Sequence, residues 1–165
     1  MAHSTVVKNF RDGTLKIDSH AASHTVQYEA GDFSISGLTS ETSSKQYEIA
    51  TYMDRGDLQS IRRTTQTFVS GSFTMHMVDL SDGSYSTAMD LILKRGSHAS
   101  AVSTLGATAD VYAVKLTLTV EESDHSGDAD HTVILDDCVC SVDVAEGDPG
   151  SISISFTCYG TVEVT

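Results

Sequence analysis

The segment SISISFTCYG, residues 151–160, alternates apolar and small hydroxyl side chains with a period of two. Its apolar members are Ile152, Ile154, Phe156 and Cys158, and its hydroxyl members are Ser151, Ser153, Ser155 and Thr157. Because successive side chains of a strand point to opposite faces of a sheet, the segment predicts a strand with one buried face and one wet face. Small polar groups on the wet face suit the wall of a water-filled channel, and residues 67–79 share this property.

The same alternation recurs along the chain, and turn residues separate its occurrences. Further strands are expected in GSFTMHMVDL (71–80), VYAVKLTLTVEE (111–122) and CVCSVDVA (138–145), with shorter ones in TLKIDS (14–19), HTVQYEA (24–30) and DFSISGL (32–38). The stretches RDGT, EAGD, SDGS and EGDPG place glycine near an acidic residue, which is typical of turns. The sequence therefore predicts a mainly β fold, a β-sandwich or partial barrel, in a single domain over residues 1–165.

One segment has helical spacing. In SYSTAMDLILKRG, residues 84–96, apolar side chains recur at Tyr85, Ala88, Met89 and Ile92 and would form one stripe. We therefore expect one flanking helix at about residues 84–95, closed by the glycine that follows it. Residues 39–56 and 97–109 are polar and weakly patterned. We therefore expect a long early inter-strand loop at residues 39–56 and a second loop at residues 97–109. Loops of this length are usually functional or become ordered by a partner.

The chain is strongly acidic, with ten Lys and Arg against 23 Asp and Glu and a net charge of −13. Residues 121–148 hold ten acids and no Lys or Arg. Such a surface repels phosphate backbones, so it argues against a protein that grips DNA and is compatible with a wall past which DNA moves. A charge that serves solubility, or adaptation to high salt, is the alternative.

Targeting signals are not evident. No apolar run approaches the ~18 residues of a membrane span, and the N-terminal stretch MAHSTVVKNFRDG has no signal-peptide core. We therefore expect neither membrane association nor export through a signal peptide.

Catalytic and metal-binding motifs are also not evident. No nucleophile elbow, phosphate loop or dinucleotide fingerprint occurs, so we expect no enzyme and no cofactor. Cys138, Cys140 and Cys158 are too few for a disulfide framework and are expected to be buried, with a metal site or a disulfide as alternatives. The segment SDHSGDADH, residues 123–131, lacks the spacing of a calcium loop, so we expect a solvated hairpin loop and no metal there.

The stretch YMDRGDLQSIRRTTQ, residues 52–66, contains the adhesion tripeptide Arg55-Gly56-Asp57. Arg62 and Arg63 follow it, so three of the five arginines lie within nine residues. Adjacent arginines on a strand face opposite sides, and a basic cluster on an acidic chain suits contact with an acidic patch on another copy. We interpret the tripeptide as a loop-to-strand turn near a subunit contact.

The order of these features resembles the major tail tube proteins of tailed bacterial viruses. The resemblance rests on LKIDSHAASHTVQYEAGDFSISGL, a polar loop, DRGDLQSIRR, GSFTMHM, one helix ending in glycine, VYAVKLTLTV and EGDPGSISISFTCYG, over about residues 10–160. It implies a β-sandwich with one helix, six copies to a ring, and rings stacked into a hollow tail tube through which DNA passes to the host without specific binding. The subunit would be a structural virion protein, made in the host cytoplasm.

The resemblance also implies partners and an interface. The partners would be other copies of the chain and the tape measure, baseplate and terminator proteins of the tail. A long loop between early strands would reach a neighbouring subunit or ring. We expect the subunit interface to include Tyr47, Tyr52, Arg55, Asp57, Arg62 and Arg63.

Two other functions remain open from the sequence. A tube subunit of a type VI-like secretion system would share the fold and carry a different cargo. A secreted carbohydrate-binding or adhesion β-sandwich would be expected to have a signal peptide and exposed aromatic residues on a binding face, and this chain has no Trp and six Tyr.

Overall fold

A computed structural model describes residues 13–20, 23–26, 33–38, 46–76, 88–120, 131–147 and 150–165. In this part of the chain the elements are β1 (Gly13–Asp18), β2 (Ser23–Val26), β3 (Ser34–Ser36), β4 (Gln46–Asp54), β5 (Asp57–Thr67), β6 (Val69–His76), α1 (Ala88–Leu93), the 3-10 turn η2 (Gly96–His98), β7 (Val114–Val120), β8 (His131–Ala145), β9 (Ser151–Cys158) and β10 (Val162–Val164). The expected mainly β fold with one flanking helix is confirmed.

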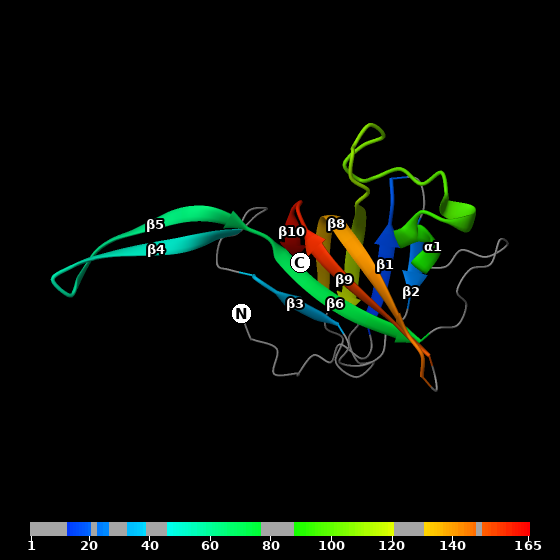
Figure 1. Ribbon diagram of the computed structural model, residues 1–165, viewed down its shortest axis with the longest axis horizontal. Coiled ribbons are helices and arrows are strands. Elements are labelled where there is room, and N and C mark those ends of the chain that lie inside the picture. The colour runs from blue at the N-terminus through cyan, green and yellow to red at the C-terminus, as the bar shows by residue number, and fades with distance from the viewer. Residues whose placement is uncertain are drawn as a thin grey trace.

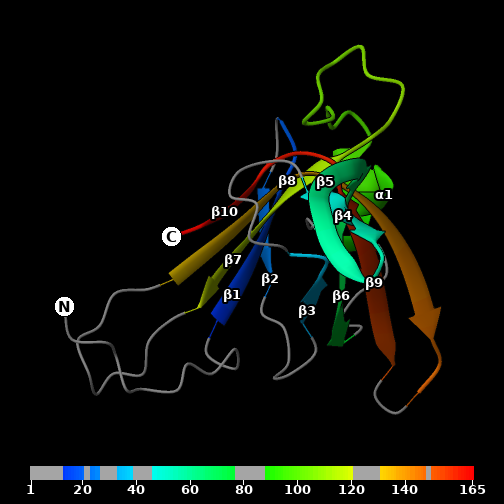
Figure 2. The same cartoon turned by 90° about the vertical axis from the view of Figure 1, so that its left-hand side faces the viewer.

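Eight strands form one antiparallel sheet in the order β2-β1-β7-β8-β9-β6-β3, and β10 pairs with the free length of β8 beyond β9. The sheet curls into a half-barrel, and α1 lies on one side of it (Figures 1 and 2). Among the described strands, β4 and β5 pair with each other and with no third strand, and they form a hairpin that projects from the body (Figure 1).

The core lies on one face of the curled sheet, where the apolar members of the alternating strands meet. Ile152, Ile154 and Phe156 of β9 are at most 3% exposed, as the alternation predicts. They pack with side chains of the neighbouring strands, among them Phe73, Leu116 and Leu135, each 0% exposed. Burial of each such side chain contributes about 1.5–3 kcal/mol, so this face holds the body together.

Helix α1 spans Ala88–Leu93, inside the predicted range, and residues 84–87 lie outside the described part of the chain. Ala88 and Ile92 are buried and Met89 packs against the core, which confirms the predicted stripe as far as it is described. The predicted closure at Gly96 is wrong, because the helix ends at Leu93 and the residue with positive φ that follows it is Lys94, at 54°. Backbone hydrogen bonds from Lys94 N to Leu91 O and from Arg95 N to Asp90 O close the last turn, and Gly96 begins the 3-10 turn η2. Tyr112 fixes the helix from the following loop, because its hydroxyl donates to Leu91 O at 2.8 Å.

The prediction of a long loop over residues 39–56 is wrong for its larger part, because Gln46–Asp54 is the strand β4. Residues 39–45 lie outside the described part of the chain. Strand β4 has the period-two alternation of a strand, but neither of its faces packs into the core. Because both faces carry many polar residues, the contrast between apolar and polar positions is weak in the sequence, and the strand was missed. Residues 97–109 do follow the expectation, since a 3-10 turn and irregular turns fill them.

The projecting hairpin as a candidate subunit interface

The hairpin of β4 and β5 turns at Arg55-Gly56, with Asp54 opposite Asp57. Both turn residues have positive φ, 49° at Arg55 and 91° at Gly56. Two-residue hairpin turns of this kind match the twist of the flanking strands and need a residue such as glycine that adopts positive φ readily. The Arg-Gly-Asp tripeptide is therefore the tip of a hairpin, which corrects the expected turn between a loop and a strand.

The strand register gives the hairpin one apolar face. Opposite residues share a face, and the pairs Met53–Leu58 and Thr51–Ile61 lie on the same side as Ile49. This face is largely uncovered in the single chain. Its large apolar side chains are exposed as follows: Ile49 61%, Met53 60%, Leu58 53% and Ile61 60%. We call these four residues the apolar face of the hairpin.

The two adjacent arginines lie on different faces of the hairpin, as the sequence predicts. Arg63, opposite Ile49, places its guanidinium 5.7 Å from the ring centre of Tyr47. Arg62, opposite Ala50, lies 5.8 Å from the ring centre of Tyr52 on the other face. Each cation–π pair holds a long flexible side chain against the hairpin and contributes about 0.5–1 kcal/mol at such an exposed site.

All six residues expected at the interface lie on this hairpin, namely Tyr47, Tyr52, Arg55, Asp57, Arg62 and Arg63. The apolar face was missed, although the spacing of Tyr47, Ile49, Thr51 and Met53 is the signal that could have found it. An isolated two-stranded hairpin is marginally stable in water. Four large apolar side chains in solvent on such a hairpin form the kind of exposed patch that typically marks an interaction site.

The sheet has a second distinctive surface on the side opposite the core. Ser34 and Ser36 of β3 lie opposite Ser72 and Ser70 of β6, and their hydroxyls approach to 3.0 and 3.2 Å. Further along the sheet, the hydroxyls of Ser141 and Ser155 approach to 2.6 Å. We call this surface the hydroxyl face; its members are Ser34, Ser36, Ser70, Ser72, Ser141, Ser155 and Thr157.

The hydroxyl face is hollowed into a groove of about 550 Å³. Gly71 is among the residues that line the groove. On the core side of the sheet, a side chain at Gly71 would collide with the carbonyl oxygen of Ser34 and with the ring of Phe156. Where β8 pairs with β9, Asp143, opposite Ser153, is the one acidic residue on this face, and Asp136 and Asp137 come just before that stretch. The surface over β3, β6, β9 and this stretch of β8 is therefore wet and shallow, and it carries a single acidic side chain.

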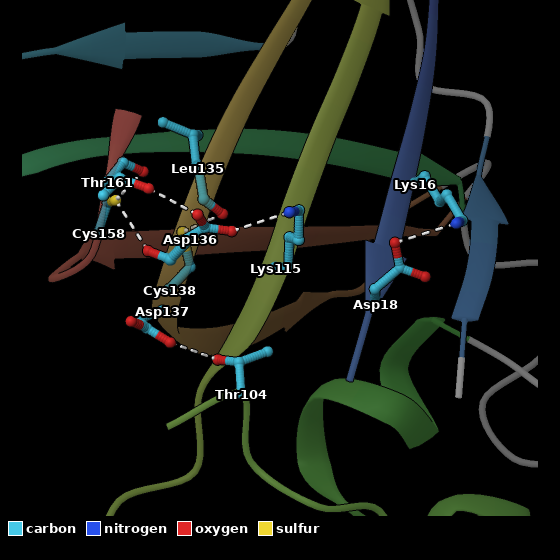
Figure 3. Close-up of polar contacts among 10 residues, drawn as sticks. All are labelled: Lys16, Asp18, Thr104, Lys115, Leu135, Asp136, Asp137, Cys138, Cys158 and Thr161. Atoms are coloured by element: carbon cyan, nitrogen blue, oxygen red, sulfur yellow. Dashed lines mark hydrogen bonds and ion pairs between the residues drawn. The ribbon is translucent and has the colours of Figure 1, made fainter. Parts of the chain in front are cut away.

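A polar cluster holds the corner where β8 passes from β9 to β10 (Figure 3). Asp136 forms an ion pair with Lys115 at 3.1 Å, and it accepts a hydrogen bond from Thr161 Oγ1 at 2.6 Å. Asp137 has a positive φ of 53° and accepts a hydrogen bond from Thr104 Oγ1 at 2.8 Å. These contacts join four segments of the chain and indicate a structural role.

The three cysteines are free thiols, and Cys138 and Cys158 are buried as expected. The two face each other across β8 and β9. A hydrogen bond between them, in which the Cys138 thiol stabilises the Cys158 thiolate, raises the pKa of Cys138 and lowers that of Cys158. Burial raises the pKa of Cys140 to about 12. Cys138 and Cys140 are therefore protonated and unreactive at neutral pH.

Neither a metal centre nor a membrane helix is found in the described residues. Among them, no three His, Cys, Asp or Glu side chains are grouped so that they could hold a metal ion. Residues 123–131, which are expected to form a solvated hairpin loop without a metal, lie outside the described part except for the last residue. The helices described here are all too short to span a bilayer.

The sequence matches no protein-family model and no curated protein. The fold, in contrast, is similar to solved structures of contractile injection systems. A chain of the PVC sheath/tube terminator in its extended state has a TM-score of 0.60 at 11% identity, with 99% of each chain covered. A chain of the PVC sheath–tube complex in its extended state has a TM-score of 0.57 at 10% identity, with 94% of this chain and 88% of that chain covered. A chain of the tube-terminating cap of the anti-feeding prophage has a TM-score of 0.59 at 9% identity, with 100% and 94% covered. At these identities the likeness shows a shared fold.

Proposed function

We propose that this chain is a non-enzymatic structural subunit of the tube of a contractile injection system, in which copies form rings and the rings stack. The apolar face of the hairpin carries the proposal, because four large side chains at 53–61% exposure need a covering surface. The similar chains in sheath–tube, terminator and cap structures support the same kind of assembly. They favour an injection-system tube over a phage tail tube that passes DNA.

The sheet supports the proposal independently, because both of its ends are edges among the described strands. In the part of the chain that the structure describes, β2 and β3 each pair with a strand on one side only, and such edges leave a row of backbone groups unpaired. Closing several curled sheets into a ring would pair these edges, as closure does in barrels. The partners are then other copies of the chain, with terminator and baseplate proteins at the two ends of the tube.

The hydroxyl face is the wall of the channel in this proposal. Its short side chains leave the passage open, and its hydroxyls are hydrated or paired with one another. A wall with a single acidic side chain per copy in this stretch offers few charges to hold anions or cations, so the cargo passes without binding. This wall departs from the acidic wall that the net charge of −13 suggests.

Negative-stain electron microscopy of the purified protein tests the assembly. Rings or tubes are expected, and a strict monomer at high concentration under all salt conditions would refute it. Labelling of assembled tubes then tests the wall. A cysteine at Ser155 should react with a small maleimide and resist a maleimide on a large polymer that cannot enter the channel. A cysteine at Thr64, which is exposed on the hairpin, is the control for a position that does not lie on the hydroxyl face of the sheet.

A further inference from the structure

An apolar row crosses the hydroxyl face at the end from which the hairpin leaves. The last paired row there contains Ser36, Ser70 and Thr157. Two residues beyond Ser70 and Thr157 come Phe68 and Tyr159, which by alternation belong to the same face. They are 43% and 49% exposed, and their rings lie 4.7 Å apart. We call these two residues the aromatic row.

The chain's own hairpin does not cover the aromatic row. Ile61 is seven residues from Phe68 along the strand that leaves the body, which corresponds to roughly 24 Å, and Leu58 is roughly 34 Å away. The hairpin points away from the sheet along this whole length (Figure 1). The apolar face and the aromatic row are therefore two separate uncovered surfaces of one chain.

We propose that the aromatic row of one copy receives the apolar face of the hairpin from a second copy. This inference rests on the proposed function and adds the receiving surface. Apart from the hairpin, the large hydrophobic residues exposed in the described part are the aromatic row, Leu38 after β3, Leu105 and Val111 of one loop, and the strand residues Val144 and Val164. The row is the one aromatic cluster among them, and aliphatic side chains laid on two aromatic rings give a contact of large area.

Charge complementarity supports the same occupant. Arg63 lies at the border of the apolar face, where Tyr47 holds its guanidinium. Asp137 lies at the border of the aromatic row, because its carbonyl oxygen accepts a hydrogen bond from Tyr159 N at 3.1 Å. A hairpin seated on the row would bring this arginine near an acidic side chain and an exposed tyrosine ring, both of which suit a guanidinium.

The two surfaces differ, so the contact is head-to-tail. Each copy offers its hairpin to one neighbour and its aromatic row to another. Contacts of this type continue until they close a ring or extend as a helical stack. The same interface thus explains why one chain type is sufficient to build a long tube.

Site-specific photo-crosslinking tests the contact in the assembled full-length protein. We would place p-benzoylphenylalanine at Ile61 and, as a matched control, at its neighbour Ser60 on the other face of the same strand. An equal mixture of ¹⁴N and ¹⁵N protein identifies links between copies by mass spectrometry. Ile61 should link to peptides that contain Phe68 or Tyr159 of another copy, and Ser60 should give few or none of these links.

Other outcomes separate the possible errors. Links from Ile61 to the loop with Leu105 and Val111, to a second hairpin, or within one chain would overturn the inference while tubes are still seen. Absence of any rings or tubes would overturn the proposed function together with it. As a second measurement, Tyr159→Ala should raise the critical concentration for assembly roughly tenfold. Unchanged assembly of this folded variant would also contradict the contact.

Discussion

Truncation of one side chain on the apolar face of the hairpin, Ile61→Ala, should weaken assembly without affecting the folded subunit. Full burial of an isoleucine side chain contributes about 1.5–3 kcal/mol. Ile61 is 60% exposed in the single chain, so about 1–2 kcal/mol is left to be gained at a contact. The loss of most of this free energy lowers the association constant of each contact by roughly tenfold. The critical concentration for assembly should rise by the same factor.

Sedimentation of polymer over a range of total protein concentration measures this change. Ser60→Ala is the matched control, because Ser60 is the adjacent residue on the opposite face of the same strand. The free energy of unfolding of the unassembled I61A subunit should stay within about 0.5 kcal/mol of wild type, as expected for an exposed position. Equal critical concentrations for I61A and S60A would refute the reasoning that the apolar face is buried on assembly.

The remaining predictions concern one charge, one thiol and one glycine. Arg63→Glu should raise the critical concentration for assembly at least tenfold, because the new carboxylate would be buried at the contact without a partner. Arg62→Glu, on the other face of the hairpin, should raise it less, and sedimentation velocity of the two variants makes the comparison. Burial raises the pKa of the Cys140 thiol from 9.0 to about 12, because the folded protein favours the neutral thiol. The stability that depends on the protonated thiol is therefore fully present below pH 9 and is lost as the pH rises toward 12. Chemical denaturation should show a loss of roughly 2 kcal/mol at about pH 10.5 that C140A lacks. Gly71→Ala should lower the free energy of unfolding by about 2 kcal/mol or more, since its Cβ would collide with Ser34 O, and a thermal melt measures it.

The body of the fold was predictable because its strands are half-buried. In β9 and β7, every second residue is apolar and buried, so the period-two pattern is strong. The short helix was predictable for the same reason, from its stripe against the core. The order of strands in the sheet was not predictable, because β1 pairs with β7 and β6 with β9 across long stretches of sequence. Local pattern carries no information about such distant partners.

The candidate interface was predictable as a location and not as a surface. The arginines and tyrosines of residues 47–63 indicated a contact there, and all lie on the hairpin. Leu58 and Ile61 could not be assigned to the same face as Ile49 and Met53, because β5 contains irregularities that shift its register against β4 between Tyr47 and Ile49 and between Tyr52 and Met53. A bulge changes which residues share a face. Leu58 and Ile61, three apart in sequence, thus lie on one side, which simple alternation does not predict.

Charge gives a reason why the proposed contact between copies would be made by the hairpin and not by the body. In the described chain outside the hairpin, eight acids oppose Lys16, Lys94, Arg95 and Lys115, a balance of −4. Residues 46–67 carry Glu48, Asp54 and Asp57 against Arg55, Arg62 and Arg63, a balance of zero. Acidic bodies repel one another and keep free subunits soluble. A neutral arm meets less repulsion when it approaches an acidic neighbour, so the apolar face can be buried there while the bodies retain their charge.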